Sequence, residues 1–450
     1  MPENSQVLFS GKQGDDLTLS EGDVTGPTRP VNASGLVAST GRSRLCGPGR
    51  YRPTHEITSV KKWISIGLAV VFAALIVAGV RFFAITPGKI DRSQNKVEPV
   101  PLNVAAAAQA LQSTLDVADM HADSLLWKRD LLERSDHGHI DLPRLIEGRY
   151  ALQVFSSVTK SPKGQNYQAN GADTDTITAL TIIDLQPPRT WSSLLERSKW
   201  HAEKMQNFAE RSGGRLRQIR TPSDVDRLLA DRRSGDAVVG GILSIEGLQN
   251  IEGNISNLDV LYAAGFRMAG LAHFFDNDVA GSMHGIEKGG LTPLGRQVVR
   301  RMETLGMIVD LAHASHATVA EVLAMATRPV VFSHGGVQAT CKVNRNLTDD
   351  EITGVAGTGG VIGIGYWSGA ICSTNPTDVA RAIVHVRDLV GIDYVGLGSD
   401  FDGSTTTGFD ASQVVAVTQA LLNIGFSEAD IRKVMGGNVL RVLRAGIAPS

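Results

Sequence analysis

Eight short apolar runs, separated by segments with helical periodicity, constrain the fold of this chain more than any other feature. Nearly continuous apolar runs that alternate with helices are typical of strands in a buried parallel sheet. Eight of them predict a closed (β/α)8 TIM-like barrel, an α/β fold, rather than an open doubly wound sheet. The Gly-rich turn of a dinucleotide-binding sheet does not follow the first run. The runs cover residues 115–121, 150–156, 238–246, 266–273, 306–313, 329–334, 361–366 and 394–400.

Helical segments fill most of the intervals between these runs. Residues 292–305 show a period of about 3.6 residues, and Thr292 is the expected N-terminal cap. Residues 377–390 show the same period, with Thr377 as the expected cap. The longest interval, 157–237, contains two helical patterns, so we expect an elaborated crossover there rather than an unstructured loop.

An uncharged apolar segment at residues 63–80 stands apart from the globular pattern. As a helix it would cover about 27 Å at ~1.5 Å per residue, close to the ~30 Å hydrocarbon core of a membrane. It lies too far from the N-terminus for a cleaved signal peptide, and a buried core helix is the less favoured alternative. We therefore expect a disordered cytoplasmic tail (1–60), a transmembrane helix (61–85), a stalk (86–103) and a catalytic barrel (104–447).

The charges beside the apolar segment favour one orientation in the membrane. Six Lys or Arg residues lie between positions 42 and 62, against four between positions 81 and 96. This difference places the N-terminus in the cytoplasm and the barrel outside it. The chain has three cysteines, and their spacing fits neither a disulfide framework nor a CxxC metal site. One bridge, Cys341–Cys372, is left open for a barrel that lies in an oxidising compartment.

Acidic and imidazole side chains occur where six of the eight predicted strands end. The strand-end residues are His121 with Asp123 just beyond it, Glu246, His273, His313, His334 and Asp400. In a barrel all the carboxyl ends of the strands meet at one rim, where barrel enzymes keep their active sites. Buried charges are costly unless they are paired or bound to a metal. The joint pattern therefore predicts a site for two divalent cations.

Each of these residues has a simpler explanation when it is taken singly. An isolated histidine is more often a satisfied core or loop residue, Asp400 would suit a turn, and Glu246 would suit a helix cap. We interpret Asp402 as a loop residue, and His137 and His139 as non-ligands in a polar loop. Four further histidines, at positions 201, 284, 316 and 385, have no strand-end context.

The mixture of imidazole and carboxylate ligands favours zinc, with manganese, cobalt or iron as alternatives. A carboxylate between two ions can bridge them, and such ions lie ~3.5–4 Å apart. The water that they share loses a proton near neutral pH and becomes a nucleophile. Asp400 is the expected acid/base group beside it. The formal net charge of −2 indicates no basic surface, so we expect no nucleic-acid partner.

Residues 104–445 resemble the membrane (renal-type) dipeptidases, binuclear zinc enzymes with an amidohydrolase-like barrel. The resemblance rests on ordered motifs: DMHAD, SIEG, LAHFFDND, VDLAHAS, VVFSHGG, NRNLTDDE and GLGSDFDG. It implies that His121 and Asp123 bind the first zinc, that Glu246 bridges both ions, and that His313 and His334 bind the second. It further implies that His273 polarises the scissile carbonyl, that Arg345 binds the substrate carboxylate, and that Asp400 is the proton shuttle.

Two segments depart from the family pattern, residues 135–149 and the loop after the second predicted strand. We expect both to border the substrate cleft, so the side-chain preference of the site is left open. The resemblance implies a metallo-dipeptidase that acts on dipeptides, including those with a D-residue at the C-terminal position. The N-terminal helix would serve as anchor, which suits a single-pass bacterial inner-membrane protein with a periplasmic barrel. A homodimer is left open. The alternatives are a metal hydrolase of another small amide or a lactone, and a catalytically dead, membrane-tethered binding protein.

Overall fold

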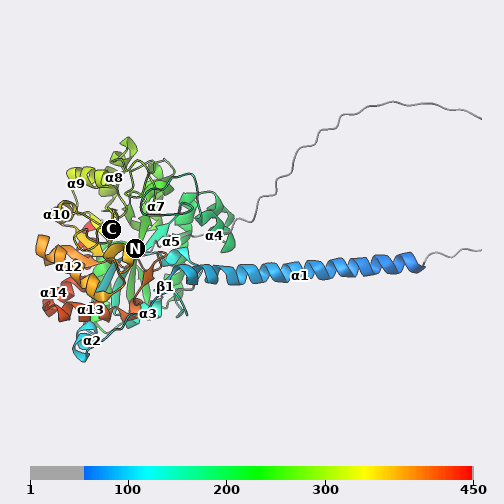
Figure 1. The fold of residues 1–450 in the computed structure, drawn as a ribbon, viewed down its shortest axis with the longest axis horizontal. Coiled ribbons are helices and arrows are strands. Elements are labelled where there is room, and N and C mark those ends of the chain that lie inside the picture. Colours follow the sequence, from blue (N-terminus) through cyan, green and yellow to red (C-terminus); the bar gives the residue numbers. More distant parts are fainter. Residues whose placement is uncertain (1–54, 448–450) are drawn as a thin grey trace, which may run out of the picture. The chain divides into compact units, whose positions relative to one another are not determined.

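A closed barrel of parallel strands forms the centre of the structure, a computed structural model that describes residues 55–447 (Figure 1). Its strands follow the order β3-β2-β10-β9-β8-β7-β6-β5, and the pairing of β3 with β5 closes the ring. The predicted α/β barrel is therefore confirmed. The eight strands are β2 (Val117–Ala122), β3 (Tyr150–Val158), β5 (Val239–Glu246), β6 (Phe266–Gly270), β7 (Ile308–Asp310), β8 (Val331–Gly335), β9 (Val361–Ile364) and β10 (Val395–Leu397).

Three further strands lie outside the ring, and the sequence patterns did not indicate them. β4 (Leu216–Gln218) pairs with the first residues of β5, whereas β6 pairs with later ones. β1 (Lys96–Val97) pairs in parallel with β11 (Thr406–Thr407) in a separate two-stranded sheet. All residues of β3 and β5 are buried, as expected for parallel strands covered on both faces.

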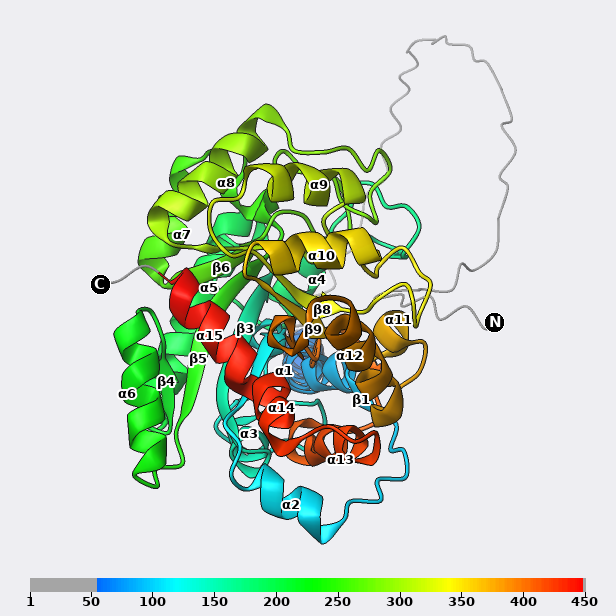
Figure 2. The same cartoon turned by 90° about the vertical axis from the view of Figure 1, so that its left-hand side faces the viewer.

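Helices surround the strands, and the end-on view in Figure 2 shows α7 to α10, α12, α13 and α15 around the sheet. The expected crossover between β3 and β5 contains α4, α5, β4 and α6. The helices are α1 (His55–Gln94), α2 (Ala106–Gln112), α3 (Leu142–Glu147), α4 (Ile177–Ile183), α5 (Leu194–Arg211), α6 (Pro222–Arg233), α7 (Ser256–Ala264), α8 (Pro293–Leu305), α9 (His316–Met325), α10 (Asp349–Gly357), α11 (Ser368–Ile371), α12 (Pro376–Val390), α13 (Val415–Asn423), α14 (Glu428–Arg432) and α15 (Asn438–Gly446).

One of the two predicted helix caps is correct and the other is wrong. The Thr292 side chain accepts a hydrogen bond from the Gly295 amide at the start of α8, as predicted. At α12 the cap is Asn375 rather than Thr377, and its side chain accepts from the Thr377 amide. Pro376 occupies the first helical position, where its missing N–H leaves no donor unpaired, so the helix begins earlier than the apolar period indicates.

The membrane-helix prediction falls on α1, and the predicted stalk is wrong in its structure. Between residues 61 and 94 this helix is long and apolar enough to cross a membrane. Residues 86–94 continue the helix through Pro87 instead of forming an irregular stalk, and Asp91 and Asn95 are buried against the barrel domain. Residues 55–82 and 83–447 belong to two separate compact units. The expected tail lies outside the described residues up to position 54, and residues 55–60 are helical.

Candidate metal centre

Four imidazole rings converge on the carboxylate of Glu246, which lies at the end of β5. The Nε2 atoms of His313, His334 and His273 lie 2.9, 3.4 and 3.5 Å from Glu246 Oε1. His121 Nε2 lies 3.7 Å from Oε2 of the same carboxylate. All five side chains are buried. The barrel thus gathers at one rim five groups that are spread over more than 200 positions of the chain.

His273, His313 and Asp400 lie three residues beyond the last strand residue rather than at the strand end itself. His313 and Asp400 adopt left-handed backbone conformations, with φ of 64° and 59°. This conformation is not that of a strand, and it changes the direction in which each side chain leaves the backbone.

Two further carboxylates face the same cluster. His121 Nε2 lies 3.4 Å from Asp123 Oδ2 and 3.9 Å from Asp400 Oδ1. A Cβ atom on Gly403 would lie 2.1 Å from Asp400 Oδ1 and 2.9 Å from Asp123 Oδ2. Any other residue at position 403 would therefore clash with both carboxylates.

Bound divalent cations explain the arrangement of the donor atoms better than hydrogen bonds among the side chains do. His313 Nε2 and His334 Nε2 lie 3.1 Å apart, and among the described residues Asp123 Oδ1 is buried without a hydrogen-bond partner. Two groups of side chains with ligand atoms within 4.8 Å share Glu246: one adds His121 and Asp123, the other His273 and His313. Nitrogen and oxygen donors without a thiolate suit a divalent metal, and two groups that share one carboxylate suit a binuclear site.

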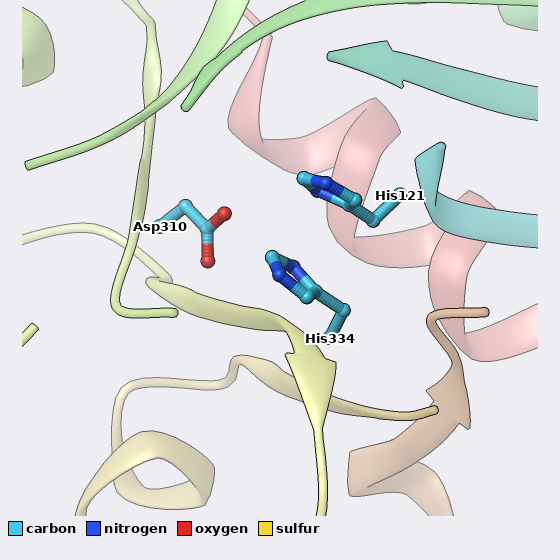
Figure 3. Close-up of side chains that lie close together, drawn as sticks. All are labelled: His121, Asp310 and His334. Atoms are coloured by element: carbon cyan, nitrogen blue, oxygen red, sulfur yellow. The ribbon is translucent and has the colours of Figure 1, made fainter. Parts of the chain in front are cut away.

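Asp310 orients a histidine of this cluster through hydrogen bonds, a role that the sequence did not predict. Figure 3 shows its carboxylate beside the rings of His121 and His334. Its oxygens already accept hydrogen bonds from the amides of Ala312 and Ser333 and, at 2.5 Å, from the Ser333 hydroxyl. Since that hydroxyl donates to Asp310, its oxygen is left to accept from His334 Nδ1, 2.8 Å away. This arrangement leaves the Nε2 lone pair of His334 free to bind a cation.

The surroundings shift the pKa values of Glu246 and Asp400 in opposite directions. Burial opposes ionisation of Glu246, but the imidazoles of His273 and His121 hold its pKa well below the usual value. Burial, reinforced by the charges of Asp123 and Glu246, holds the pKa of Asp400 well above the usual value. Burial also holds the pKa of His313 well below its usual value, so this imidazole is neutral, as a metal ligand must be. The cluster thus combines a carboxylate that stays ionised, Glu246, with a carboxyl group that holds its proton more strongly than usual, Asp400.

Arg345 lies in the pocket that opens onto this cluster, together with His273 and Asp400. Its Nη2 donates a hydrogen bond of 2.6 Å to the His334 carbonyl, while Nη1 is buried and has no hydrogen-bond partner within residues 55–447. The guanidinium lies 5.3 Å from the ring centroid of Phe332 and 5.8 Å from that of Trp367. This is a rigid, preorganised cation with one free edge, suited to a carboxylate.

The loop after β3 forms another wall of the pocket, as expected for this departure from the family pattern, whereas none of residues 135–149 lines the pocket. The Tyr167 hydroxyl accepts a hydrogen bond of 2.9 Å from Trp367 Nε1, and the Tyr167 carbonyl accepts one from Asn344 Nδ2. His284, predicted to have no role at the rim, is buried, and its ring centroid lies 5.3 Å from that of His313. The sequence indicated the loop but did not single out Tyr167, an aromatic residue within a polar segment.

A disulfide bond joins Cys341 and Cys372, the pair that the sequence left open. It links the segment that precedes Arg345 to the end of α11, with a Cα–Cα distance of 5.4 Å. The connection after β8 and the connection after β9 are therefore covalently joined.

A (β/α)8 barrel with clustered histidines and carboxylates at the carboxyl ends of its strands defines a metal-dependent hydrolase. The chain belongs to the membrane dipeptidase family, peptidase family M19, whose family model matches residues 105–447. It is a peptide-bond hydrolase of the dipeptidase class that uses divalent metal.

Curated relatives and solved structures agree with this assignment. The chain is 32% identical to Dipeptidase tcpJ of Claviceps purpurea over 320 residues, covering 68% of this chain and 69% of that protein. It is 31% identical to Dipeptidase aclJ of Aspergillus oryzae over 350 residues, covering 73% and 77%. A metallopeptidase structure from Rhodobacter sphaeroides, liganded with a phosphinate mimic of L-Ala-D-Ala, matches with a TM-score of 0.61 and 25% identity, covering 74% of this chain and 99% of that one.

Proposed function

We propose that this chain is a membrane-anchored, zinc-dependent dipeptidase whose two ions share Glu246. In this proposal His121 and Asp123 bind the first ion, and His313 and His334 bind the second. The observation that carries it is the convergence of four Nε2 atoms within 3.7 Å of one carboxylate, next to a buried guanidinium with a free edge. Zinc is favoured over calcium or magnesium because imidazole donors predominate.

The side chains that face the pocket suggest how a dipeptide is held. Arg345 binds the terminal carboxylate through its free Nη1, which orients the peptide bond toward the cluster. His273 polarises the scissile carbonyl by donating a hydrogen bond to its oxygen. Asp400 takes a proton from the attacking water and returns it to the leaving amine, a role that suits its raised pKa. When bound, the divalent ions supply Lewis acidity toward the carbonyl and the water.

The substrate is proposed to include dipeptides with a D-residue at the C-terminal position. Support comes from the Rhodobacter sphaeroides structure, whose bound ligand mimics L-Ala-D-Ala. Two other readings are a metal hydrolase of a different amide or a lactone, and an inactive binding protein. Neither reading accounts for a buried arginine beside a complete ligand set as directly as a dipeptidase does.

We further propose that α1 anchors the enzyme in a membrane with the barrel outside the cytoplasm. Its apolar length and the excess of Lys and Arg on its N-terminal side support this arrangement. The Cys341–Cys372 bridge suits an oxidising compartment, such as the periplasm of a bacterium. An inner-membrane location and a homodimer are the remaining predictions.

A panel of dipeptides tests the proposed function. The full chain, purified with added zinc, is assayed on dipeptides with L- and D-residues at each position, on their C-terminal amides, and on lactones. We expect turnover of dipeptides with a free carboxylate, and at least tenfold lower kcat/KM for the amides. Hydrolysis of lactones without hydrolysis of any dipeptide would instead assign the site to another substrate class.

A further inference from the structure

The turn that carries Asp400 is an unusual piece of backbone. Asp400, Asp402 and Ser404 all adopt left-handed conformations, with φ of 59°, 61° and 58°. Such conformations are unfavourable for residues other than glycine and persist only where the surroundings hold them. Something outside the turn must therefore keep it in this shape.

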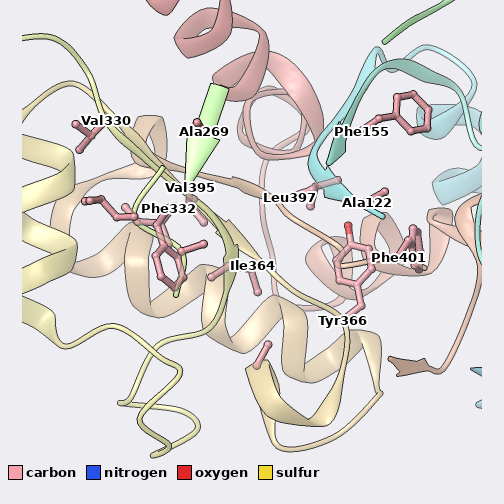
Figure 4. Packing of buried hydrophobic residues seen from close by; sticks show 14 of the residues in the cluster. Ala122, Phe155, Ala269, Val330, Phe332, Ile364, Tyr366, Val395, Leu397 and Phe401 are labelled. Atoms are coloured by element: carbon pink, nitrogen blue, oxygen red, sulfur yellow. The ribbon is translucent and has the colours of Figure 1, made fainter. Parts of the chain in front are cut away.

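Part of the support comes from packing of the residue between the two aspartates. Figure 4 shows Phe401 beside Tyr366 and close to Ala122, within the cluster of buried apolar residues. The ring centroids of Phe401 and Tyr366 lie 5.4 Å apart. This contact holds the middle of the turn in place. It does not provide hydrogen-bond partners for Asp400 and Asp402 on either side.

Asp402, predicted to be an ordinary loop residue, is fully buried and supplies the polar anchor. Its Oδ2 accepts a hydrogen bond of 2.6 Å from Ser124, the neighbour of Asp123, and forms an ion pair of 2.7 Å with Arg129. Its Oδ1 accepts from the His139 amide at 2.7 Å. Asp402 thus ties the turn that carries Asp400 to the segment that carries Asp123.

Residues at the end of α1 complete this network. Asp91 Oδ2 accepts a hydrogen bond of 2.6 Å from Nε of Arg129, the same guanidinium whose Nη2 pairs with Asp402. Asp91 Oδ1 accepts from Asn95 Nδ2 at 2.8 Å, and Asn95 Oδ1 in turn accepts from the Ser404 amide at 3.0 Å. Two paths therefore lead from Asp91 to the turn, one through Arg129 and one through Asn95.

The backbone that follows α1 makes a second set of contacts with the same turn. The Lys96 amide donates to the Thr405 carbonyl at 3.2 Å, and the Glu98 amide donates to the Thr407 carbonyl at 2.8 Å, as β1 pairs with β11. His139 Nε2 donates to the Lys96 carbonyl at 2.9 Å, so its Nδ1 is free to accept from the Asp402 amide. Residues 91–98 thus border the turn along most of its length.

We propose that residues 91–98, which join the candidate membrane helix to the barrel, are a positioning element of the active site. Asp91 and Asn95 hold the strained turn in the one shape that aims Asp400 at the metal cluster. This inference rests on the proposed role of Asp400 and goes beyond the family's barrel, which the family model matches only from residue 105. In this proposal, the contacts of residues 91–98 set the position of the Asp400 side chain.

Three single variants of the full chain test this proposal: Asp91→Asn, Asn95→Leu and, as the matched control, Arg92→Ala. Arg92 follows Asp91 on the same helix and pairs with Asp136, but that ion pair is exposed and does not reach Asp402. We expect Asp91→Asn and Asn95→Leu to lower kcat on a cleaved dipeptide at least tenfold. KM and bound metal should change little, the midpoint of thermal unfolding should fall because a buried ion pair or hydrogen bond is lost, and Arg92→Ala should match the wild type.

A second readout does not depend on turnover. Hydrogen exchange, followed by mass spectrometry, should be at least tenfold faster in Asp91→Asn for amides of residues 401–408, and unchanged in Arg92→Ala. Unchanged exchange of this segment in both Asp91→Asn and Asn95→Leu would overturn the inference, whether or not the wild type cleaves dipeptides. So would a fall in kcat that is accompanied by an equal loss of bound metal. A wild type without dipeptide turnover would instead refute only the proposed function.

Discussion

The Nε2 atoms of His313, which follows β7, and His334, which lies in β8, are 3.1 Å apart, and burial favours the neutral form of both imidazoles. His334 Nδ1 donates to Ser333, so His334 Nε2 carries a lone pair, and a cation can be bound by this lone pair together with that of His313 Nε2. We expect a chelator to abolish activity and to lower the unfolding midpoint by several degrees. A ligand at 100 times its Kd stabilises the folded state by about 2.7 kcal/mol. Activity and midpoint should return together on titration with Zn²⁺, measured by dipeptide hydrolysis and calorimetry. Full activity after verified metal removal would contradict the metal centre.

Replacing the shared carboxylate should remove turnover without unfolding the barrel. Glu246→Gln keeps the size of the side chain but removes the charge that four imidazoles surround. We expect kcat to fall on the order of 10³-fold or more, together with loss of at least one bound ion. Steady-state kinetics and elemental analysis measure both effects. Glu287→Gln, an exposed control on the loop before α8, should behave like the wild type.

The substrate carboxylate should be recognised by Arg345. Arg345→Ala should raise KM for a dipeptide about 10–100-fold, because a charge-assisted hydrogen bond contributes about 1.5–3 kcal/mol. The same variant should hardly change the kinetics of the corresponding dipeptide amide. Arg296→Ala, which removes an exposed guanidinium paired with Glu321 on the outer helices, serves as the control. Equal losses on both substrates would show that Arg345 does not read the carboxylate.

The disulfide bond should stabilise both the domain and the position of Arg345. In the chain-entropy treatment, a bridge between residues 31 positions apart contributes about 3–4 kcal/mol. We expect the double variant Cys341→Ser/Cys372→Ser to unfold at a lower temperature and to show a raised KM, because the segment before Arg345 is no longer tied to α11. A reductant should bring the wild type to the same midpoint and leave the double variant unchanged. Peptide mapping under non-reducing conditions checks the pairing itself.

Asp184 should make the stability of the barrel domain depend on pH. Burial raises the pKa of Asp184 to about 6 from 3.8, and its Oδ1 has no hydrogen-bond partner among the described residues. Because the folded state favours the protonated acid, this group costs stability as pH rises from about 4 to about 6, and the full cost is present above that. Asp184→Asn should therefore stabilise the protein by up to about 3 kcal/mol at pH 7.5 and much less at pH 4.5. Urea unfolding at the two pH values measures this difference, with the exposed Asp236→Asn as control. An equal gain at both pH values would contradict the assignment.

The fold and most of the candidate metal ligands could be predicted from the sequence because both depend on local patterns. Continuous apolar runs indicate buried parallel strands, and each candidate ligand is a chemically distinctive residue close to the end of such a run. The caps were less certain: Thr292 was predicted correctly, but Asn375 takes the place of Thr377 because Pro376 begins the helix. The stalk was mispredicted because Asp91 and Asn95 look like residues of a polar linker until their buried partners are known.

By itself, then, the sequence determined the barrel, the apolar helix and the kinds of side chain at the rim. Only the tertiary structure decided that Asp310 supports His334, that Tyr167 walls the pocket, that Cys341 pairs with Cys372, and that Asp91 reaches Asp402 through Arg129. The physical reason is that periodicity and residue type act over a few neighbouring positions. The burial of a charge and the shape of a strained turn depend instead on tertiary contacts with residues that are distant in the sequence.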